Sequence, residues 1–216
     1  MKRVRNGLKD LIWPRKCILC HRLVGPEGER VCPACAASLP EPFSGTRRGT
    51  HYRRWASALW YEDPFRASFL RFKFGGCRFY AEIYGPWLAN AVRKQLGEEW
   101  DLLTYVPISR LRRWRRGYDQ TLLLAEAASK SLGLSPVCTL KKKNTRAQSR
   151  TLSPEERKRN IRGAFRVIDA EAVKGKRVLL IDDVLTTGAT VSEASKVLLE
   201  AGAKSVDVAT LAAAPK

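Results

Sequence analysis

Residues 178–190 read VLLIDDVLTTGAT and place two adjacent acids directly before a loop of threonine, glycine and alanine. The apolar run VLLI suits a strand buried on both faces of a parallel sheet, with Asp182 and Asp183 at its carboxyl end. Glycine in the loop lets backbone N–H groups turn toward one point. A helix starting at Val191 would add the partial positive charge of its N-terminus. The loop is therefore predicted to hold a phosphate group.

The two acids and the phosphate loop together fit one ligand. Carboxylates repel a phosphate, but they accept hydrogen bonds from a sugar diol, either directly or through a divalent cation. A ligand that carries both a phosphate and vicinal hydroxyls is a ribose 5-phosphate. We therefore expect the 2- and 3-hydroxyls at Asp182 and Asp183, and the 5-phosphate at Thr186, Thr187, Gly188, Ala189 and Thr190.

Three other interpretations of this stretch were weighed. Nucleotide triphosphatases also end a strand in acidic residues, but the chain has no G-x4-G-K-[ST] loop, and Gly175-Lys176-Arg177 lacks the rest of that motif. Phosphoacceptor receiver domains use paired acids, but near an N-terminal strand and without a Thr/Gly loop. The acids could also act only as helix caps. Ribose-phosphate binding is favoured over all three.

Cysteines form a second pattern near the N-terminus, C-x2-C, eleven intervening residues, then C-x2-C. Two such pairs complete a tetrahedral shell of four thiolates, so a zinc ion held there would be structural rather than catalytic. Disulfides or redox cysteines are the alternative, and His21 could replace one ligand. Cys77 and Cys138 lie outside the pattern and are expected to be free thiols. The predicted zinc ligands are Cys17, Cys20, Cys32 and Cys35.

The chain is strongly basic, with 40 Lys and Arg against 21 Asp and Glu and a net charge of +19. Such an excess favours a polyanionic partner, either nucleic acid or a phosphorylated metabolite. Basic residues cluster at 110–116, 141–150 and 157–166, and aromatic residues interleave the first cluster. Cations that follow phosphates and rings that stack on bases are typical of single-stranded nucleic-acid binding. The predicted contacts are Arg112, Arg113, Trp114, Arg115 and Arg116.

A simpler interpretation of this charge stays open. The arginines could serve a phosphorylated ligand or the solvent alone, and the rings of Trp60 and Tyr61 could belong to the core.

Strand and helix patterns alternate along most of the chain. This alternation predicts an α/β protein with a mostly parallel sheet flanked by helices, with ligands at the carboxyl ends of the strands. Strands are expected at 56–61, 101–107, 137–140, 177–181 and 206–211, and helices at 85–96, 122–134 and 191–202.

The patterns divide the chain into three parts. Residues 1–37 are expected to form an N-terminal helix that Pro14 ends and the four-cysteine zinc module. Residues 38–54 are rich in Pro, Gly, Ser and Arg and are interpreted as a linker, and 55–216 as the α/β domain. No run of about 18 apolar residues predicts a membrane span. The N-terminus lacks the apolar region of a secretory signal, so a cytoplasmic location is expected.

Residues 178–190 resemble the signature of type I phosphoribosyltransferases, which bind phosphoribosyl pyrophosphate (PRPP). Three further stretches and the four-cysteine module extend the likeness to nearly the whole chain, which resembles the ComF family of competence-related, phosphoribosyltransferase-like proteins. The resemblance implies a type I phosphoribosyltransferase-like fold with a small zinc-ribbon-like module at the N-terminus. The stretches are RFKFGG (71–76), VPISRLRRWRRGYDQ (106–120) and KNTRAQSRTLSPEERKRNIRGAF (143–165).

The resemblance also implies roles for individual residues. Asp182 and Asp183 would be the catalytic pair at the ribose, with Mg²⁺ bridging the diol and the pyrophosphate. Family members usually read R-G-F-N-Q where this chain has Tyr118 and Asp119, and aspartate in place of asparagine removes hydrogen-bond donors at position 119. The implied pyrophosphate contacts are Lys73, Val106, Pro107, Ile108 and Ser109, and the implied residues of a mobile flap are Gln148, Arg157 and Asn160.

Likeness to competence proteins implies a role in DNA uptake during natural transformation. The protein would act on single-stranded DNA at the cytoplasmic side, with the DNA-uptake or recombination machinery as possible partners. A metabolic phosphoribosyltransferase of the nucleotide salvage type, or a non-catalytic nucleic-acid-binding protein with a relic PRPP site, are the alternatives. A catalytic protein would displace pyrophosphate at the anomeric carbon, but no sequence feature identifies the acceptor.

Overall fold

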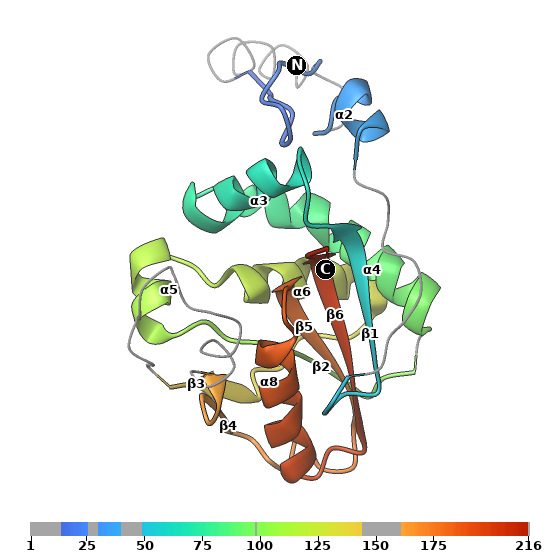
Figure 1. Cartoon of the computed structure of the whole chain (residues 1–216), viewed down its shortest axis with the longest axis vertical. Helices are drawn as coiled ribbons and strands as arrows, with labels where there is room; N and C mark the ends of the chain where they lie inside the picture. Colours follow the sequence, from blue (N-terminus) through green and yellow to red (C-terminus); the bar gives the residue numbers. More distant parts are fainter. Residues whose placement is uncertain (1–13, 26–29, 40–48, 98, 144–160, 216) are drawn as a thin grey trace, which may run out of the picture.

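The chain folds around a four-stranded sheet, seen in a computed structural model that describes residues 14–25, 30–39, 49–97, 99–143 and 161–215 (Figure 1). The spatial order of the strands is β1-β6-β5-β2, and all three neighbouring pairs are parallel. The predicted α/β class with a mostly parallel sheet is therefore confirmed. The strands are β1 (Arg54–Trp60), β2 (Leu102–Tyr105), β5 (Arg177–Leu185) and β6 (Ser205–Ala213).

The three predicted helices are present, with their ends shifted by a few residues. They are α4 (Ala81–Leu96), α6 (Gln120–Leu132) and α8 (Ala189–Glu200). No helix in the described ranges combines the length and the apolar character that a membrane span requires. The shorter helices, which were not predicted, are α2 (Pro33–Ala37), α3 (Phe65–Phe74), the 3-10 turn η1 (Arg78–Tyr80) and α5 (Arg110–Arg116).

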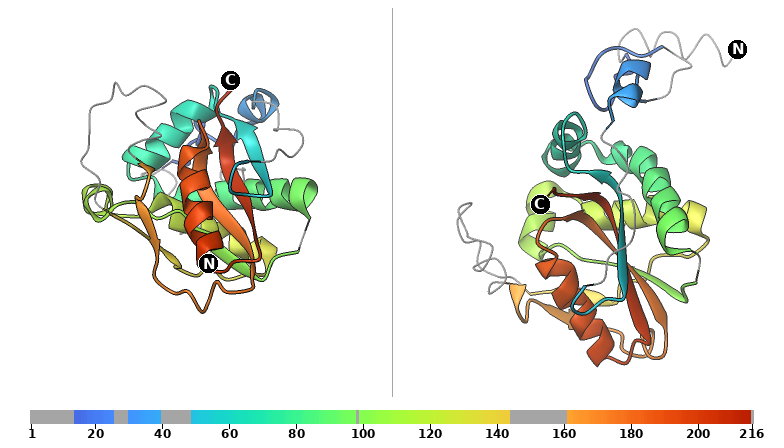
Figure 2. Two further views of the ribbon diagram at one scale, coloured as in Figure 1. Left: turned by 60° about the horizontal axis from the view of Figure 1, so that its bottom comes forward. Right: turned by 45° about the vertical axis from the view of Figure 1, so that its right-hand side comes forward.

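Each face of the sheet carries its own hydrophobic core, because successive side chains of a strand point to opposite faces. Leu179 and Ile181 of the central strand β5 pack with residues of α3, α4 and α6. Val178 and Leu180 pack with α8 and with the short strand β4 (Phe165–Val167) on the other face. Figure 2 shows the sheet between these two layers. The uninterrupted VLLI run is thus explained by burial on both faces.

The strand predicted at 137–140 is wrong. Pro136 forms only an isolated bridge to β2, and regular pairing starts later, at β3 (Leu140–Lys142). Strand β3 pairs antiparallel with β4 (Phe165–Val167) in a separate two-stranded sheet. At Thr139 the backbone already pairs with the second sheet, since its carbonyl accepts the N–H of Ile168, the residue that follows β4, at 2.9 Å.

Candidate functional site

The aspartate pair lies within strand β5 and not after it. The expectation that this strand ends at residue 181 is wrong, since β5 continues to Leu185. Because side chains alternate along a strand, Asp182 follows Leu180 to the face of α8, and Asp183 lies on the face of α6. Both residues are buried, with 8% and 9% of their surface exposed. The two carboxylates therefore have different surroundings.

Asp183 is held by two side chains from neighbouring helices. Lys73 Nζ of α3 lies 2.7 Å from Asp183 Oδ2, and Gln120 Nε2 of α6 donates to the same oxygen at 2.9 Å. Burial alone would raise the pKa of Asp183, but the charge and hydrogen bond of Lys73, with that of Gln120, hold it below its ordinary value. Asp183 is therefore an ionised carboxylate whose partners are protein groups.

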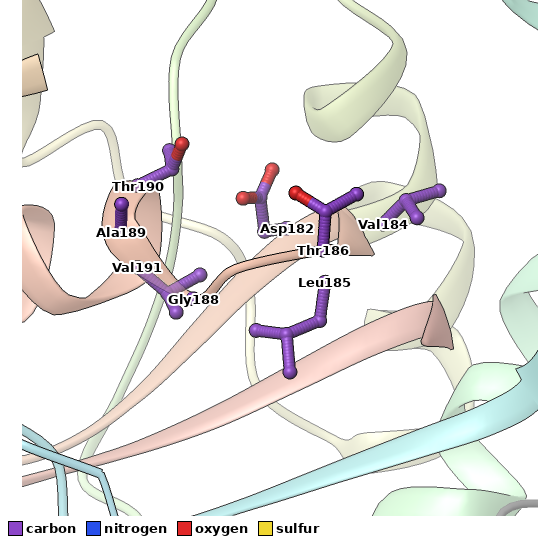
Figure 3. Close-up of a pocket in the computed structure, with 8 residues that line it drawn as sticks. All are labelled: Asp182, Val184, Leu185, Thr186, Gly188, Ala189, Thr190 and Val191. Carbon is purple, nitrogen blue, oxygen red and sulfur yellow. The ribbon is translucent and has the colours of Figure 1, made fainter. Parts of the chain in front are cut away.

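Asp182 faces the loop that follows β5. Its Oδ1 accepts the N–H of Asp183 at 2.8 Å, and burial together with the Asp183 charge raises its pKa to about 7. Figure 3 shows its carboxylate pointing to the same side as the hydroxyls of Thr186 and Thr190. Hydroxyl donors or a divalent cation would stabilise the charged form of such a group. Asp182 is thus the member of the pair that is suited to a polar ligand in this hollow.

The loop after β5 ends at Gly188, the N-cap of α8, whose φ of 74° is one that glycine adopts without strain. The first N–H groups of an α-helix have no acceptor within the helix, so those of α8 that no other group engages can face an anion. Four of the five predicted phosphate residues line the hollow, while Thr187 Oγ1 accepts the Ala189 N–H at 3.4 Å. The lining residues are Asp182, Val184, Leu185, Thr186, Gly188, Ala189, Thr190 and Val191.

Two residues of the predicted linker also lie against this loop. His51 Nδ1 is 3.0 Å from Ser192 Oγ in the first turn of α8. A Cβ at Gly188 would lie 3.3 Å from the Tyr52 hydroxyl oxygen. No sequence pattern linked this distant segment to the phosphate loop, because the contact depends on how the chain enters β1.

The loop predicted to contact pyrophosphate begins at the end of β2, beside β5. The Val106 N–H donates to the Ile181 carbonyl at 2.9 Å, and the Ile108 N–H donates to Asp119 Oδ2 at 3.1 Å. Ser109 caps helix α5, where its Oγ accepts a backbone N–H at 3.4 Å. The structure therefore brings the 106–109 loop and Lys73 to the same strand end as the aspartates. The predicted flap residues Gln148, Arg157 and Asn160 lie outside the described residues.

Two further cations, Lys142 and Arg116, approach the aspartates. Lys142 was not predicted as a site residue, and Arg116 was predicted only as a nucleic-acid contact. Lys142 of β3 is half-buried, and its Nζ lies 5.0 Å from the centre of the Phe165 ring. Burial lowers the pKa of Lys142, and the charge of Asp182 opposes that shift. Burial likewise lowers the pKa of Arg116, and the charge of Asp183 opposes it. The spacing of residues in the sequence did not indicate that Lys142 and Gln120 lie near the aspartates, because each reaches them from another element.

The four predicted zinc ligands converge in space. Their sulfur atoms lie within 4.8 Å of one another, and all four are free thiols, so the group could hold a metal ion. Burial would raise the pKa of Cys17, but backbone hydrogen bonds from Cys20 and Cys32 outweigh it and lower the pKa to about 6. His21 contacts the Tyr80 hydroxyl at 3.3 Å instead of completing the group.

Helix α5 presents the predicted nucleic-acid residues to solvent. None of its residues is buried, and 81% of the Trp114 side chain is exposed. Arg112, Arg113 and Arg115 are also exposed, whereas Arg116 lies over the Phe74 ring at 4.7 Å. By contrast, Trp55 of β1 is buried in the core.

Known proteins are similar in sequence to this chain. Residues 120–216 match the family model of the phosphoribosyl transferase domain. The chain is 30% identical over 201 residues to "DNA utilization protein YhgH" of Salmonella typhimurium, covering 89% of this chain and 87% of that protein. It is 38% identical over 112 residues to "Competence protein F" of Haemophilus influenzae, covering 50% and 48%.

A third relative is "Competence protein ComFC" of Streptococcus pneumoniae, which is 32% identical over 151 residues, covering 70% of this chain and 64% of that protein. The sequence matches, the clustered cysteines and the parallel sheet all support the same family. The chain therefore belongs to the ComF family, whose members are similar to phosphoribosyltransferases.

Proposed function

We propose that the carboxyl end of β5 binds PRPP together with Mg²⁺. The observation that carries the proposal is Asp182, a buried carboxylate with a raised pKa that lines one hollow together with the N-terminus of α8. The ribose hydroxyls would donate to this carboxylate, and the 5-phosphate would accept from the loop at 186–190. A ligand that joins a diol to a phosphate accounts for both halves of the hollow.

The surrounding residues fit a magnesium complex of PRPP. Proteins commonly bind Mg²⁺ through one or two carboxylates plus substrate phosphates, and Asp182, which lines the hollow, would supply one carboxylate. When bound, the ion would neutralise part of the charge of the pyrophosphate. Asp183 would fix the strand end through Lys73 and Gln120. Lys142 and Arg116 would add positive potential at the same place.

Calorimetric titration of PRPP with Mg²⁺ tests this site. The Asp182→Asn variant removes a charge without changing the volume, and we expect PRPP affinity to fall at least about 10-fold, as for a lost charged hydrogen bond. Asp101→Asn is the matched control. Asp101 pairs with Arg177 at a distance of 2.9 Å, and Arg177 begins β5 at the end of the strand opposite to Asp182. Equal losses in both variants, or no binding by the unmodified protein, would contradict the proposal.

We further propose that the protein serves DNA uptake, acting on incoming single strands at the cytoplasmic side with the DNA-uptake or recombination machinery. The names of its relatives support this role, and the exposed basic helix α5 supports contact with the strand. A structural zinc ion at the four cysteines is part of the same proposal, supported by their number and proximity.

Phosphoribosyl transfer is the second candidate function, favoured by the match to the phosphoribosyl transferase domain. A screen of pyrophosphate release over bases and single-stranded DNA separates the two. Release with one base alone would make the protein a salvage-type enzyme, and release with none of them would favour a binding protein.

A further inference from the structure

We propose that Asp119 closes the 106–109 loop to pyrophosphate, so that the site recognises mainly the ribose 5-phosphate part of its ligand. The inference rests on the proposed ribose-phosphate function and sharpens its specificity. At position 119 the chain has aspartate where family members usually have asparagine, so the side chain has fewer hydrogen-bond donors. The inference assigns a role to this difference.

The backbone donors of the 106–109 loop are almost all engaged within the protein. The Val106 N–H donates to the Ile181 carbonyl at 2.9 Å. Pro107 has no N–H. The Ile108 N–H donates to the Asp119 carboxylate at 3.1 Å. Since each residue has only one backbone donor, the loop has at most the Ser109 N–H for an anion.

Asp119 performs two tasks with its two oxygens. Oδ1 accepts the N–H groups of Thr121 and Leu122, at 3.0 and 3.2 Å, and so caps helix α6. Oδ2 accepts the Ile108 N–H and so ties the loop to that helix. Asparagine could perform only the first task, because its Nδ2 is a donor and would face the donor of Ile108. The choice of aspartate therefore decides whether this loop amide is free.

The charge of Asp119 acts in the same direction as its hydrogen bonds. The carboxylate is buried, with 7% exposed, and its Oδ2 lies at the loop, so an ionised Asp119 would repel a pyrophosphate placed there. Lys73, the other predicted pyrophosphate contact, is paired with Asp183 at 2.7 Å. The 5-phosphate side is different, since the start of α8 lines the hollow there. The two ends of PRPP should therefore contribute unequally to its binding.

The ratio of two affinities tests this inference. We would titrate ribose 5-phosphate and PRPP, each with Mg²⁺, into the unmodified protein and into Asp119→Asn. In the unmodified protein we expect the two dissociation constants to agree within about 3-fold. Asp119→Asn should tighten PRPP binding about 10-fold, through one freed amide and one removed charge, and leave ribose 5-phosphate binding unchanged.

Asp169→Asn is the matched control. Asp169 Oδ1 accepts the Ala172 N–H at 3.0 Å in an exposed turn, so the same chemical change there should leave the ratio unaltered. A purely structural effect of Asp119→Asn would weaken both ligands together and would not change their ratio.

Three outcomes count against the inference. PRPP binding more than about 100-fold tighter than ribose 5-phosphate binding in the unmodified protein would overturn it, even if the variant does not fold. An unchanged ratio in a folded Asp119→Asn variant would also overturn it, while the proposed function would stand. If neither ligand binds the unmodified protein, the proposed function is wrong and the inference is wrong with it.

Discussion

At the scale of single residues, four buried aspartates show that the partners of a carboxylate decide its role. Asp183 has a cation and an amide as partners, and its pKa is lowered. Asp182, the next residue, has its pKa raised by burial and by that neighbour. Asp119 caps a helix and ties a loop, whereas Asp207 lies at the base of the sheet between arginines. Two adjacent acids in a sequence do not show which of these cases applies. The partners depend on the face of the strand or helix to which each side chain points.

Asp207 gives a stability prediction at this scale. Arg53 and Arg54 lie 2.6 and 2.8 Å from its Oδ2, and Trp100 Nε1 donates to the same oxygen at 3.2 Å. Asp207→Asn should lower the free energy of unfolding at pH 7 by about 2 kcal/mol, because Arg53 and Arg54 lose the charge of the buried carboxylate that accepts their hydrogen bonds. This value is below the range for fully buried pairs because both arginines are partly exposed. Denaturant unfolding measures the difference.

The pH dependence of this effect has a definite sign. Burial would raise the pKa of Asp207, but the hydrogen bonds from Arg53 and Arg54 outweigh it and lower the pKa. A lowered pKa in the folded state stabilises the protein above the unfolded value of about 4, and this contribution is lost as pH falls through the folded value. The penalty of Asp207→Asn should therefore shrink below about pH 4. Glu200→Gln, at an exposed pair with Lys196, should show almost no effect at any pH.

At the scale of elements, helix α5 lies exposed on the surface, which suits the proposed contact with a single strand. None of the residues of α5 is buried, and the helix exposes the indole of Trp114 and four arginines, Arg110, Arg112, Arg113 and Arg115. Trp114→Ala should weaken binding of an oligothymidylate about 10-fold, because stacking on one base contributes about 1–3 kcal/mol. Leu199→Ala, an exposed apolar residue of α8, is the control.

Salt tests the electrostatic part of this interface. Single-strand affinity measured by fluorescence anisotropy should fall steeply between about 50 and 200 mM salt, because bound cations release counterions from the phosphates. Affinity that does not depend on salt, or equal losses in the Trp114 and Leu199 variants, would contradict a role of α5 in binding.

The same helix shows what the sequence could not predict. The core strands and α4, α6 and α8 were predictable because burial imposes a period on their apolar residues. Helix α5 has only two apolar residues, Leu111 and Trp114, and neither is buried, so it shows no such period. Helix α3 has buried Phe65, Phe69 and Phe72 at helical spacing, a signal that was present but was not used. The strand expected at 137–140 failed because apolar character alone does not say which sheet a segment joins.

The residues of the candidate site also fall into two groups, those that the sequence could predict and those that it could not. Asp182, Asp183 and the 186–190 loop are contiguous, so local pattern was enough to predict them. Gln120, Lys142 and Tyr52 approach the site from three other elements. Their positions depend on tertiary packing, which the spacing of residues in one chain does not encode.

At the scale of the whole molecule, helix α3 joins the cysteine module to the aspartate pair. Arg71 Nη2 donates to the carbonyls of Ile18 and Leu19, at 2.7 and 2.6 Å, between the first two cysteines. Two residues further along the same helix, Lys73 pairs with Asp183. Figure 1 shows α3 between the N-terminal module and the rest of the fold. A change in the conformation of the turn that carries these cysteines should therefore affect α3 more directly than any other helix.

Loss of the proposed zinc ion tests this connection. Cys20→Ser removes one ligand, so zinc content should fall well below one ion per chain, and the turn at 17–20 should no longer hold its carbonyls toward Arg71. Hydrogen exchange should then increase at the amides of α3 and stay unchanged at those of α8, which packs on the other face of the sheet. Cys138→Ser, an exposed cysteine outside the module, is the matched control and should change neither zinc content nor exchange. Zinc loss with unaltered exchange in α3 would show that the module and the aspartate site are independent, because the helix they share would not have responded.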